Sequence, residues 1–162
     1  MILVGVDPGH HGAIAVYDAS SRRVCAVHDM PIYRKVVARG ERTRIDPLRL
    51  FRIIDEIGAT GADCVIVEDV QGRGLQKGAS EMGYGVGLIH MACTVARLTV
   101  EMVQPAVWKR KLRVPADKKG ATERAELLFP QQRELFRGSR GGFLDGRAEA
   151  AMIALYGAEK RS

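Results

Sequence analysis

Three short apolar runs separated by turn residues open the chain. They span Ile2–Asp7, Gly12–Asp18 and Arg23–Met30. The breaks between them read PGHH and ASSR and are short enough for hairpins, so the pattern predicts a three-stranded antiparallel meander. Residues 31–45, which follow, are basic and show no hydrophobic period, and we expect a mobile loop there.

The hydrophobic period then becomes that of helices and buried strands. Asp46 and Pro47 are typical of an N-cap and a first helical turn, and the helix is expected to end at Gly58 or Gly61. A continuous apolar run predicts a buried strand at Cys64–Glu68. The remaining elements are expected to be a helix from about Ser80 to Arg97, a strand at Thr99–Val103, and helices at about Val107–Leu112, Ala121–Phe129 and Asp145–Glu159. This order predicts an α/β fold with a mixed five-stranded sheet flanked by helices.

The length of 162 residues suits a single domain covering 1–162, and no repeat or linker divides the chain. No apolar run is long enough to span a membrane, and the N-terminus lacks the features of a signal peptide. We therefore expect a cytoplasmic, nucleoid-associated protein with no membrane partner. The three cysteines form no CxxC pair and are expected to be reduced core thiols: Cys25, Cys64 and Cys93.

The net charge of +6 is concentrated in two basic segments. Arg34–Arg52 carries seven basic residues against two acidic ones, and Lys109–Arg140 carries ten against four. Two such segments on an otherwise balanced chain favour a polyanion partner, with phosphates as the first candidate. A solvated surface is the alternative for each segment.

Four carboxylates are expected to meet at one edge of the sheet. Asp7 ends the first strand in GVDPG, and Glu68 ends the fourth in VIVED. Asp145 and Glu149 are four residues apart, one turn of the last helix, and therefore share a face. Each has a simpler explanation, because an aspartate can cap a turn and acids are favoured at the start of a helix.

Like charges at this spacing repel, and a divalent cation would compensate them. Carboxylate oxygens are the ligands that hard cations such as Mg²⁺ prefer. Two such ions about 3.5–4 Å apart stabilise the attacking and leaving oxygens when a phosphodiester is cleaved. The acidic cluster therefore indicates metal-dependent phosphodiester chemistry.

At this point the chain resembles the RuvC-like Holliday junction resolvases of the ribonuclease H/retroviral-integrase superfold. The resemblance rests on GVDPG, VIVED and DGRAEAAMIA in this order. The DGRAEA motif departs from bacterial RuvC, where two aspartates three apart are usual, and is more similar to the plant chloroplast and phage-type members. QPAVWKRKL and KKGATERAELLFP also resemble that branch, so the likeness covers nearly the whole chain.

The resemblance implies a homodimer that binds a four-way DNA junction and nicks two opposed strands symmetrically. It implies two Mg²⁺ or Mn²⁺ ions per active site, held by the catalytic residues Asp7, Glu68, Asp145 and Glu149. It also implies a lysine near the scissile phosphate, either Lys118 or Lys119. Whether a branch-migration helicase is a partner stays open, and a phage-encoded protein would act in the host cytoplasm.

The DNA contacts are expected in two places. The glycine-rich stretch QGRGLQKG suits entry into a junction centre, although it also fits a simple surface loop. The basic side chains expected to contact DNA are Arg73, Lys77, Lys109, Arg110 and Lys111. His10 and His11, beside Asp7, are interpreted as exposed turn residues without a catalytic role.

Gly83 and Gly87 are four residues apart in a predicted helix, and each glycine lowers the stability of that helix. Such a pair lets another backbone approach closely, either in the core or across a two-fold axis. Physical chemistry alone does not choose between packing in the core and contact across a two-fold axis. The resemblance favours the dimer contact.

Three other functions fit parts of the sequence. GVDPGHHGAIAVYD also looks like the phosphate loop of actin-like sugar kinases, which need two such domains, whereas this length allows one. A RuvX-type ribosomal RNA processing nuclease would use similar chemistry. A non-catalytic nucleic-acid-binding module would explain the basic segments and would not need all four acids.

Overall fold

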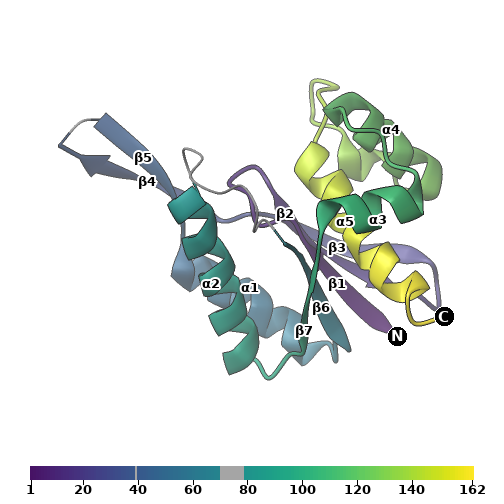
Figure 1. Cartoon of the computed structure of the whole chain (residues 1–162), viewed down its shortest axis with the longest axis horizontal. Helices are drawn as coiled ribbons and strands as arrows, with labels where there is room; N and C mark the ends of the chain where they lie inside the picture. The colour runs from purple at the N-terminus through teal and green to yellow at the C-terminus, as the bar shows by residue number, and fades with distance from the viewer. Residues whose placement is uncertain (39, 70–78) are drawn as a thin grey trace.

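A mixed five-stranded sheet forms the centre of the molecule in the computed structural model, which describes residues 1–38, 40–69 and 79–162 (Figure 1). The strand order is β3-β2-β1-β6-β7. The first three strands form an antiparallel meander, and β6 and β7 run parallel to β1. Their bounds are Ile2–Val6 for β1, Ala13–Asp18 for β2, Arg23–Asp29 for β3, Cys64–Glu68 for β6 and Val100–Val103 for β7. The predicted fold class and the predicted meander are confirmed.

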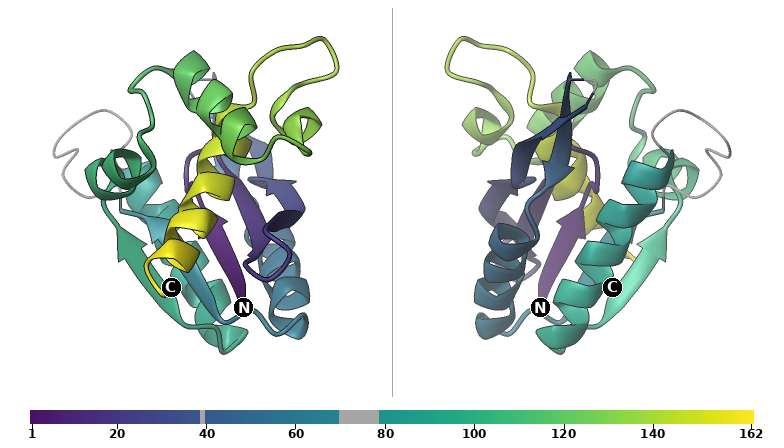
Figure 2. Two further views of the ribbon diagram at one scale, coloured as in Figure 1. Left: turned by 90° about the vertical axis from the view of Figure 1, so that its right-hand side faces the viewer. Right: turned by 90° about the vertical axis from the view of Figure 1, so that its left-hand side faces the viewer.

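Helices cover both faces of the sheet (Figure 2). One face is covered by α1 (Pro47–Ala59) and α2 (Ala79–Val95), and the other by α5 (Asp145–Glu159). On the side of α5 lie α3 (Pro105–Leu112), α4 (Lys118–Leu128) and a 3₁₀ turn at Arg133–Phe136. Within the described residues, no helix has the length and apolar character needed to cross a membrane.

Residues 32–37 and 40–45 form a β-hairpin, so the prediction of a mobile loop over residues 31–45 was wrong. Its strands are β4 (Ile32–Val37) and β5 (Gly40–Ile45), and they pair in a separate two-stranded sheet that projects from one end of the molecule (Figure 1). The hydrophobic period was missing because most of the hairpin is exposed, with Ile45 at its base buried in the core.

Two smaller expectations also need correction. Helix α4 begins at Lys118, three residues before the predicted start, because the side chain of Asp117 caps it by accepting from the Gly120 N–H at 2.8 Å. Cys25 is exposed and is not a core thiol. It lies on the edge strand β3, where the alternation of the strand turns it away from the buried Val24.

Helix α5 lies unusually close to β1, which explains why the last helix is rich in alanine. A Cβ atom added to Gly5 would lie 2.1 Å from the carbonyl oxygen of Ala150. At the first turn of α5, a Cβ atom on Gly146 would lie 2.1 Å from the carbonyl oxygen of His11. Only small residues permit this approach. The start of α5 is therefore held against the turn that follows β1.

Candidate active site

The alternation of side chains along β1 and β6 brings Asp7 and Glu68 together. The strands pair in parallel, with Leu3 opposite Cys64 and Gly5 opposite Ile66. Two residues further along, this register sets Asp7 opposite Glu68. Because side chains alternate with a period of two, both carboxylates lie on the sheet face that α5 covers. The sequence prediction of adjacent strand ends thus agrees with the observed register.

Asp7 lies partly buried just beyond the end of β1. Burial raises the pKa of its carboxyl to about 6, against the backbone N–H of Gly9, which donates to Oδ1 at 3.1 Å and lowers it. The negative charges of Glu149 and Asp145 raise the pKa further, and the positive charge of Lys109 lowers it. Both acids of α5 therefore raise the pKa of Asp7.

Glu68 is 5% exposed at the end of β6. Burial raises its pKa to about 7, and the charge of Asp7 adds to the rise. The indole N–H of Trp108 donates to Oε1 at 3.0 Å and lowers the pKa, while Glu149 raises it and Lys109 lowers it. The four predicted carboxylates therefore interact electrostatically at one sheet edge.

Helix α3 supplies two partners for these acids. Trp108 is fully buried and holds Glu68 through its indole N–H. Lys109 Nζ lies 2.7 Å from Glu149 Oε1 and 5.2 Å from the centre of the Trp108 ring. The sequence assigned Lys109 to DNA contact and gave Trp108 no role. The signal that could have indicated a role for Trp108 is that a buried indole N–H needs an acceptor.

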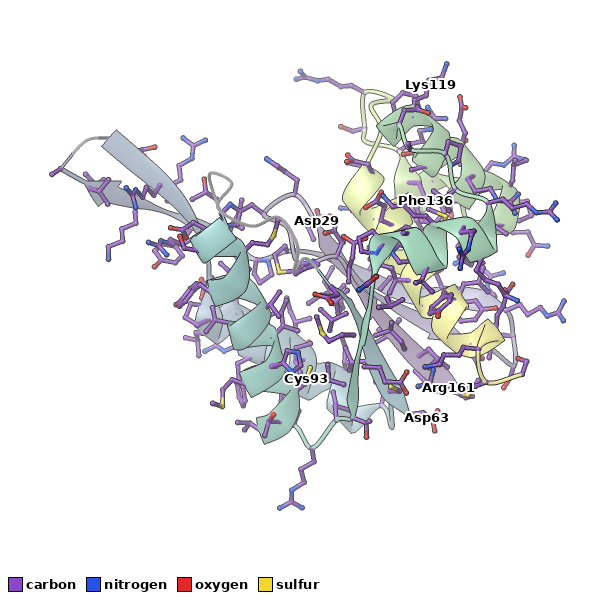
Figure 3. All side chains as sticks on the ribbon, viewed as in Figure 1. Asp29, Asp63, Cys93, Lys119, Phe136 and Arg161 are labelled. Atoms are coloured by element: carbon purple, nitrogen blue, oxygen red, sulfur yellow. The ribbon has the colours of Figure 1, made fainter. Side chains whose placement is uncertain are left out.

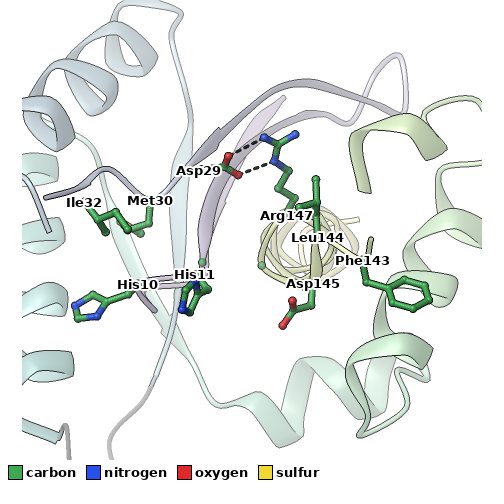
Figure 4. Close-up of a pocket in the computed structure, with 11 residues that line it drawn as sticks. His10, His11, Asp29, Met30, Ile32, Phe143, Leu144, Asp145 and Arg147 are labelled. Carbon is green, nitrogen blue, oxygen red and sulfur yellow. Dashed lines mark hydrogen bonds and ion pairs between the residues drawn. The ribbon is translucent and has the colours of Figure 1, made fainter. Parts of the chain in front are cut away.

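An open cavity of about 560 Å³ lies beside Asp145 (Figure 4). Arg147 closes one side by donating to both carboxylate oxygens of Asp29, at 2.6 and 2.7 Å. This ion pair ties the first turn of α5 to the end of β3. The other side chains that line the cavity include His10, His11, Ile32, Phe143 and Leu144. Of the four predicted carboxylates, Asp145 is the one that lines this cavity.

Two solved structures share this architecture. The structure of T. thermophilus RuvC in complex with Holliday junction substrate matches with a TM-score of 0.67 and 17% identity, covering 98% of this chain and 93% of that one. A Thermus thermophilus RuvC structure matches with a TM-score of 0.58 and 16% identity, covering 99% and 97%. The chain has the RuvC fold. No protein-family model and no curated protein matches the sequence, and the likeness to the chloroplast and phage-type branch stays a prediction.

On this RuvC fold, Arg110 and Lys111 lie beside the last turns of α5 and not beside its first turn. Arg110 and Lys111 line a cavity of about 340 Å³ beside Tyr156 and Glu159. Tyr156 and Glu159 belong to the last turns of α5, whereas Asp145 is its first residue. Glu149, which pairs with Lys109, lies seven residues before Tyr156, so the two positions are about 10 Å apart along the axis of α5. Arg110 and Lys111 therefore lie farther along α5 than the contact that Lys109 makes.

The lysines at the start of α4 are not brought to the carboxylates by any described contact. Lys119 is exposed and lies 3.7 Å from Glu123 in the same helix (Figure 3). The side chain of Lys118 lies outside the described residues, as do Arg73 and Lys77. Neither lysine is favoured over the other by these contacts.

The donor chemistry of the site fits a hard divalent cation. Its oxygen ligands are carboxylates. Burial raises the pKa of Asp7 and of Glu68, and neighbouring carboxylates raise both further, while the charge of Lys109 lowers them in part. Across the parts of the chain that the structure describes, no three His, Cys, Asp or Glu side chains are close enough to hold a metal as they stand. The described side chains therefore offer suitable donor atoms without forming a ready-made metal site.

Proposed function

We propose that the protein is a structure-selective endonuclease that resolves four-way DNA junctions by hydrolysing two phosphodiester bonds. The observation that carries this proposal is that the partly buried Asp7 and the buried Glu68 lie together at one edge of the sheet, where the acids of α5 raise their pKa values further. The RuvC fold supports the choice of substrate, since one similar structure contains a Holliday junction substrate. We place the activity in the cytoplasm, close to the nucleoid or, for a phage-encoded protein, in the host cell.

The metal ligands in this proposal are Asp7, Glu68, Asp145 and Glu149, with two Mg²⁺ or Mn²⁺ ions per active site. Bound ions would activate the attacking water and stabilise the leaving oxygen. The chain itself orients the donors. The Gly9 N–H holds the Asp7 carboxylate, and the Trp108 N–H holds that of Glu68.

Two further contacts set the position of α5 and the local charge. The paired hydrogen bonds between Arg147 and Asp29 fix the first turn of α5, which carries Asp145. Lys109 balances Glu149 in the absence of substrate and provides a cation for the phosphate when DNA is bound. A contact from Lys118 or Lys119 to the scissile phosphate, and DNA contacts by Arg73, Lys77, Arg110 and Lys111, remain part of the proposal.

A homodimer suits both the substrate and the outer face of α2. A Cβ atom on Gly83 or Gly87 would meet nothing within 4 Å among the described residues, so neither glycine packs in the monomer core there. Met91 and Val95 follow Gly83 and Gly87 at the same four-residue spacing along α2, and their side chains are 62% and 56% exposed. A junction has two equivalent strands to cut, and a two-fold dimer presents two identical sites to them. We propose this face of α2 as the dimer contact.

One assay separates the candidate functions. A synthetic four-way junction, a duplex, a flap and a structured RNA are incubated with Mg²⁺ or with a chelator, and the products are resolved on a denaturing gel. We expect paired, symmetric nicks in the junction that need the metal. Cleavage of the RNA alone would favour the RuvX-type nuclease. Binding of nucleic acid without cleavage of any substrate would favour a non-catalytic module.

A further inference from the structure

The β4–β5 hairpin supplies none of the proposed catalytic or metal-binding residues, yet it carries much of the net charge. Residues 32–45 contain five basic side chains and one acidic side chain. The hairpin is anchored at its base, where Ile45 is buried and Arg44 pairs with Glu81 at 2.6 Å. The rest projects into solvent, with Val36 78% exposed. Packing in the core therefore does not explain why the hairpin is rich in basic residues.

The register of the hairpin sorts its side chains onto two faces. Tyr33 lies opposite Arg44 and Lys35 opposite Arg42, so these four share one face, here called the basic face. The basic face contains no acidic side chain. The opposite face, here called the mixed face, carries Arg34, Val36, Glu41 and Thr43. Arg34 and Glu41 form an ion pair at 3.4 Å, so the mixed face is balanced within itself.

The basic face is unfavourable for the hairpin alone. Lys35 and Arg42 are directly opposed, and like charges in such a pair destabilise a two-stranded sheet. Charged side chains, lysine above all, also protect exposed strand edges from aggregation. That protection does not require two cations directly opposite each other, so it leaves the pair of Lys35 and Arg42 unexplained.

A nucleic acid backbone matches the chemistry of this face. Lys35 and Arg42 are exposed cations suited to phosphates. Tyr33, 43% exposed on the same face, offers a ring for stacking on a sugar or a base. Arg44 lies on the same face, but its charge is balanced by Glu81 of α2, and it also lies 5.7 Å from the ring centre of Tyr84. The cations that this face offers to a phosphate are therefore Lys35 and Arg42.

The hairpin also starts beside the catalytic edge. Ile32, its first residue, lines the same cavity as His11 and Asp145. From there the two strands project outward at the end of the molecule where β1 and β6 finish (Figures 1 and 2). A strand of DNA leaving the catalytic edge on this side would pass along the hairpin.

We propose that the basic face of the β4–β5 hairpin binds the phosphate backbone of a junction arm next to the cleaved strand. This inference rests on the proposed junction-binding function. A protein partner or a second copy of the chain on the same face would give different results in the test below.

The test compares two double variants within the hairpin. K35A/R42A removes two charges from the basic face, whereas the control R34A/E41A removes the neutral pair of the mixed face. Affinity for a labelled four-way junction is measured in chelator over a series of salt concentrations. We expect the slope of log affinity against log salt to fall by about two in magnitude for K35A/R42A, about one per phosphate contact. R34A/E41A should match the wild type.

Two further measurements keep the result unambiguous. Circular dichroism establishes that both variants are folded, and acylation of Lys35 in the wild-type protein should be slowed by bound junction without any mutation. An unchanged slope together with unprotected Lys35 overturns the inference. A change from dimer to monomer in sedimentation for K35A/R42A, with the slope unchanged, also overturns it in favour of a contact between copies.

These outcomes are distinct from failure of the proposed function. If the wild type resolves junctions while K35A/R42A keeps the full salt dependence, only the role of the hairpin is wrong. If the wild type cleaves no junction while K35A/R42A has weaker, less salt-dependent binding, the hairpin still binds nucleic acid and the resolvase proposal is wrong.

Discussion

The ammonium group of Lys109 lies 2.7 Å from Glu149 Oε1, and its charge also lowers the pKa of Asp7 and of Glu68. One lysine of α3 thus offsets part of the charge that four carboxylates bring to one sheet edge. In the proposed mechanism, a divalent cation that binds Glu149 would compete with this lysine. Metal binding and the position of Lys109 would then be coupled.

Replacing Lys109 with Met should tighten binding of Mg²⁺ or Mn²⁺ because the competing ammonium group is removed. A partly exposed ion pair is worth about 1 kcal/mol, which corresponds to about fivefold in the half-saturating metal concentration. The measurement is the melting temperature of the protein over a metal titration. Arg110→Met, at the neighbouring position beside the last turns of α5, is the matched control. Equal midpoints for the wild type and Lys109→Met would show that the lysine does not compete with the metal.

The four carboxylates should be needed for cleavage and not for junction binding. Asp7→Asn, Glu68→Gln, Asp145→Asn and Glu149→Gln should each slow cleavage about a thousandfold or more, since bound metal supplies several kcal/mol and about 1.4 kcal/mol is a factor of ten. Junction affinity should persist because it comes mainly from basic contacts to phosphates.

Single-turnover cleavage and binding in chelator are measured side by side for these variants. Glu159→Gln is the control, because it removes an exposed acid from the far end of the same helix and should leave cleavage intact. A carboxylate variant with near-wild-type turnover in Mg²⁺ would not belong to the site. Loss of junction binding in a variant would instead indicate a structural role for that acid.

The metal-free protein should lose stability as the pH rises from about 5 to about 8. The folded-state pKa values of Asp7 and Glu68, about 6 and about 7, exceed those of unfolded carboxyls. Between these limits the folded chain holds more protons than the unfolded chain, so the free energy of unfolding falls with rising pH. The stability that these two protonated groups contribute is present at low pH. It is lost as the pH rises through their folded-state pKa values.

Asp7→Asn and Glu68→Gln keep an acceptor oxygen for the Gly9 and Trp108 N–H groups and remove the charge. Each variant should therefore melt above the wild type at pH 8 in chelator, by an amount on the order of several degrees. The difference should shrink toward pH 5, where the wild-type carboxyls are protonated. Thermal melts followed by circular dichroism measure this, and coincident curves at pH 8 would contradict the raised pKa values of these buried acids.

The sequence predicted those features of the fold and site that depend on local pattern. The strand ends that carry Asp7 and Glu68 follow from continuous apolar runs, and their common face follows from the period of two. Asp145 and Glu149 share a face because they are one helical turn apart. The hairpin at 31–45 was missed because a two-stranded arm without a buried face lacks the alternation that identifies a strand.

Contacts between distant residues were beyond the sequence for a different reason. Trp108 and Glu68 are 40 positions apart, as are Lys109 and Glu149. These pairs form only because α3 packs beside α5 and the end of β6, and no local period encodes that packing. The basic run at 109–111 therefore predicted a uniform DNA contact, whereas packing turns Lys109 toward Glu149 and Arg110 and Lys111 toward the last turns of α5.

Gly87 offers a test of the dimer in which the monomer and the dimer respond in opposite directions. In the monomer a Cβ atom there meets nothing within 4 Å among the described residues. Gly87→Ala should therefore stabilise the isolated helix by about 1 kcal/mol. If the glycine lies at a close contact between two copies, the same methyl group weakens association. We expect a higher melting temperature at low protein concentration together with a larger dimer dissociation constant in sedimentation.

The larger side chain in Gly87→Leu should shift the protein to monomer and turn paired nicks in a cruciform plasmid into single nicks. A monomer carries one active site, so it cuts one strand per encounter and leaves the junction unresolved. If Gly87→Leu stays dimeric and nicks in pairs, the contact between copies lies elsewhere on the surface. If the wild type sediments as a monomer even with junction bound, the paired-nick mechanism itself is wrong.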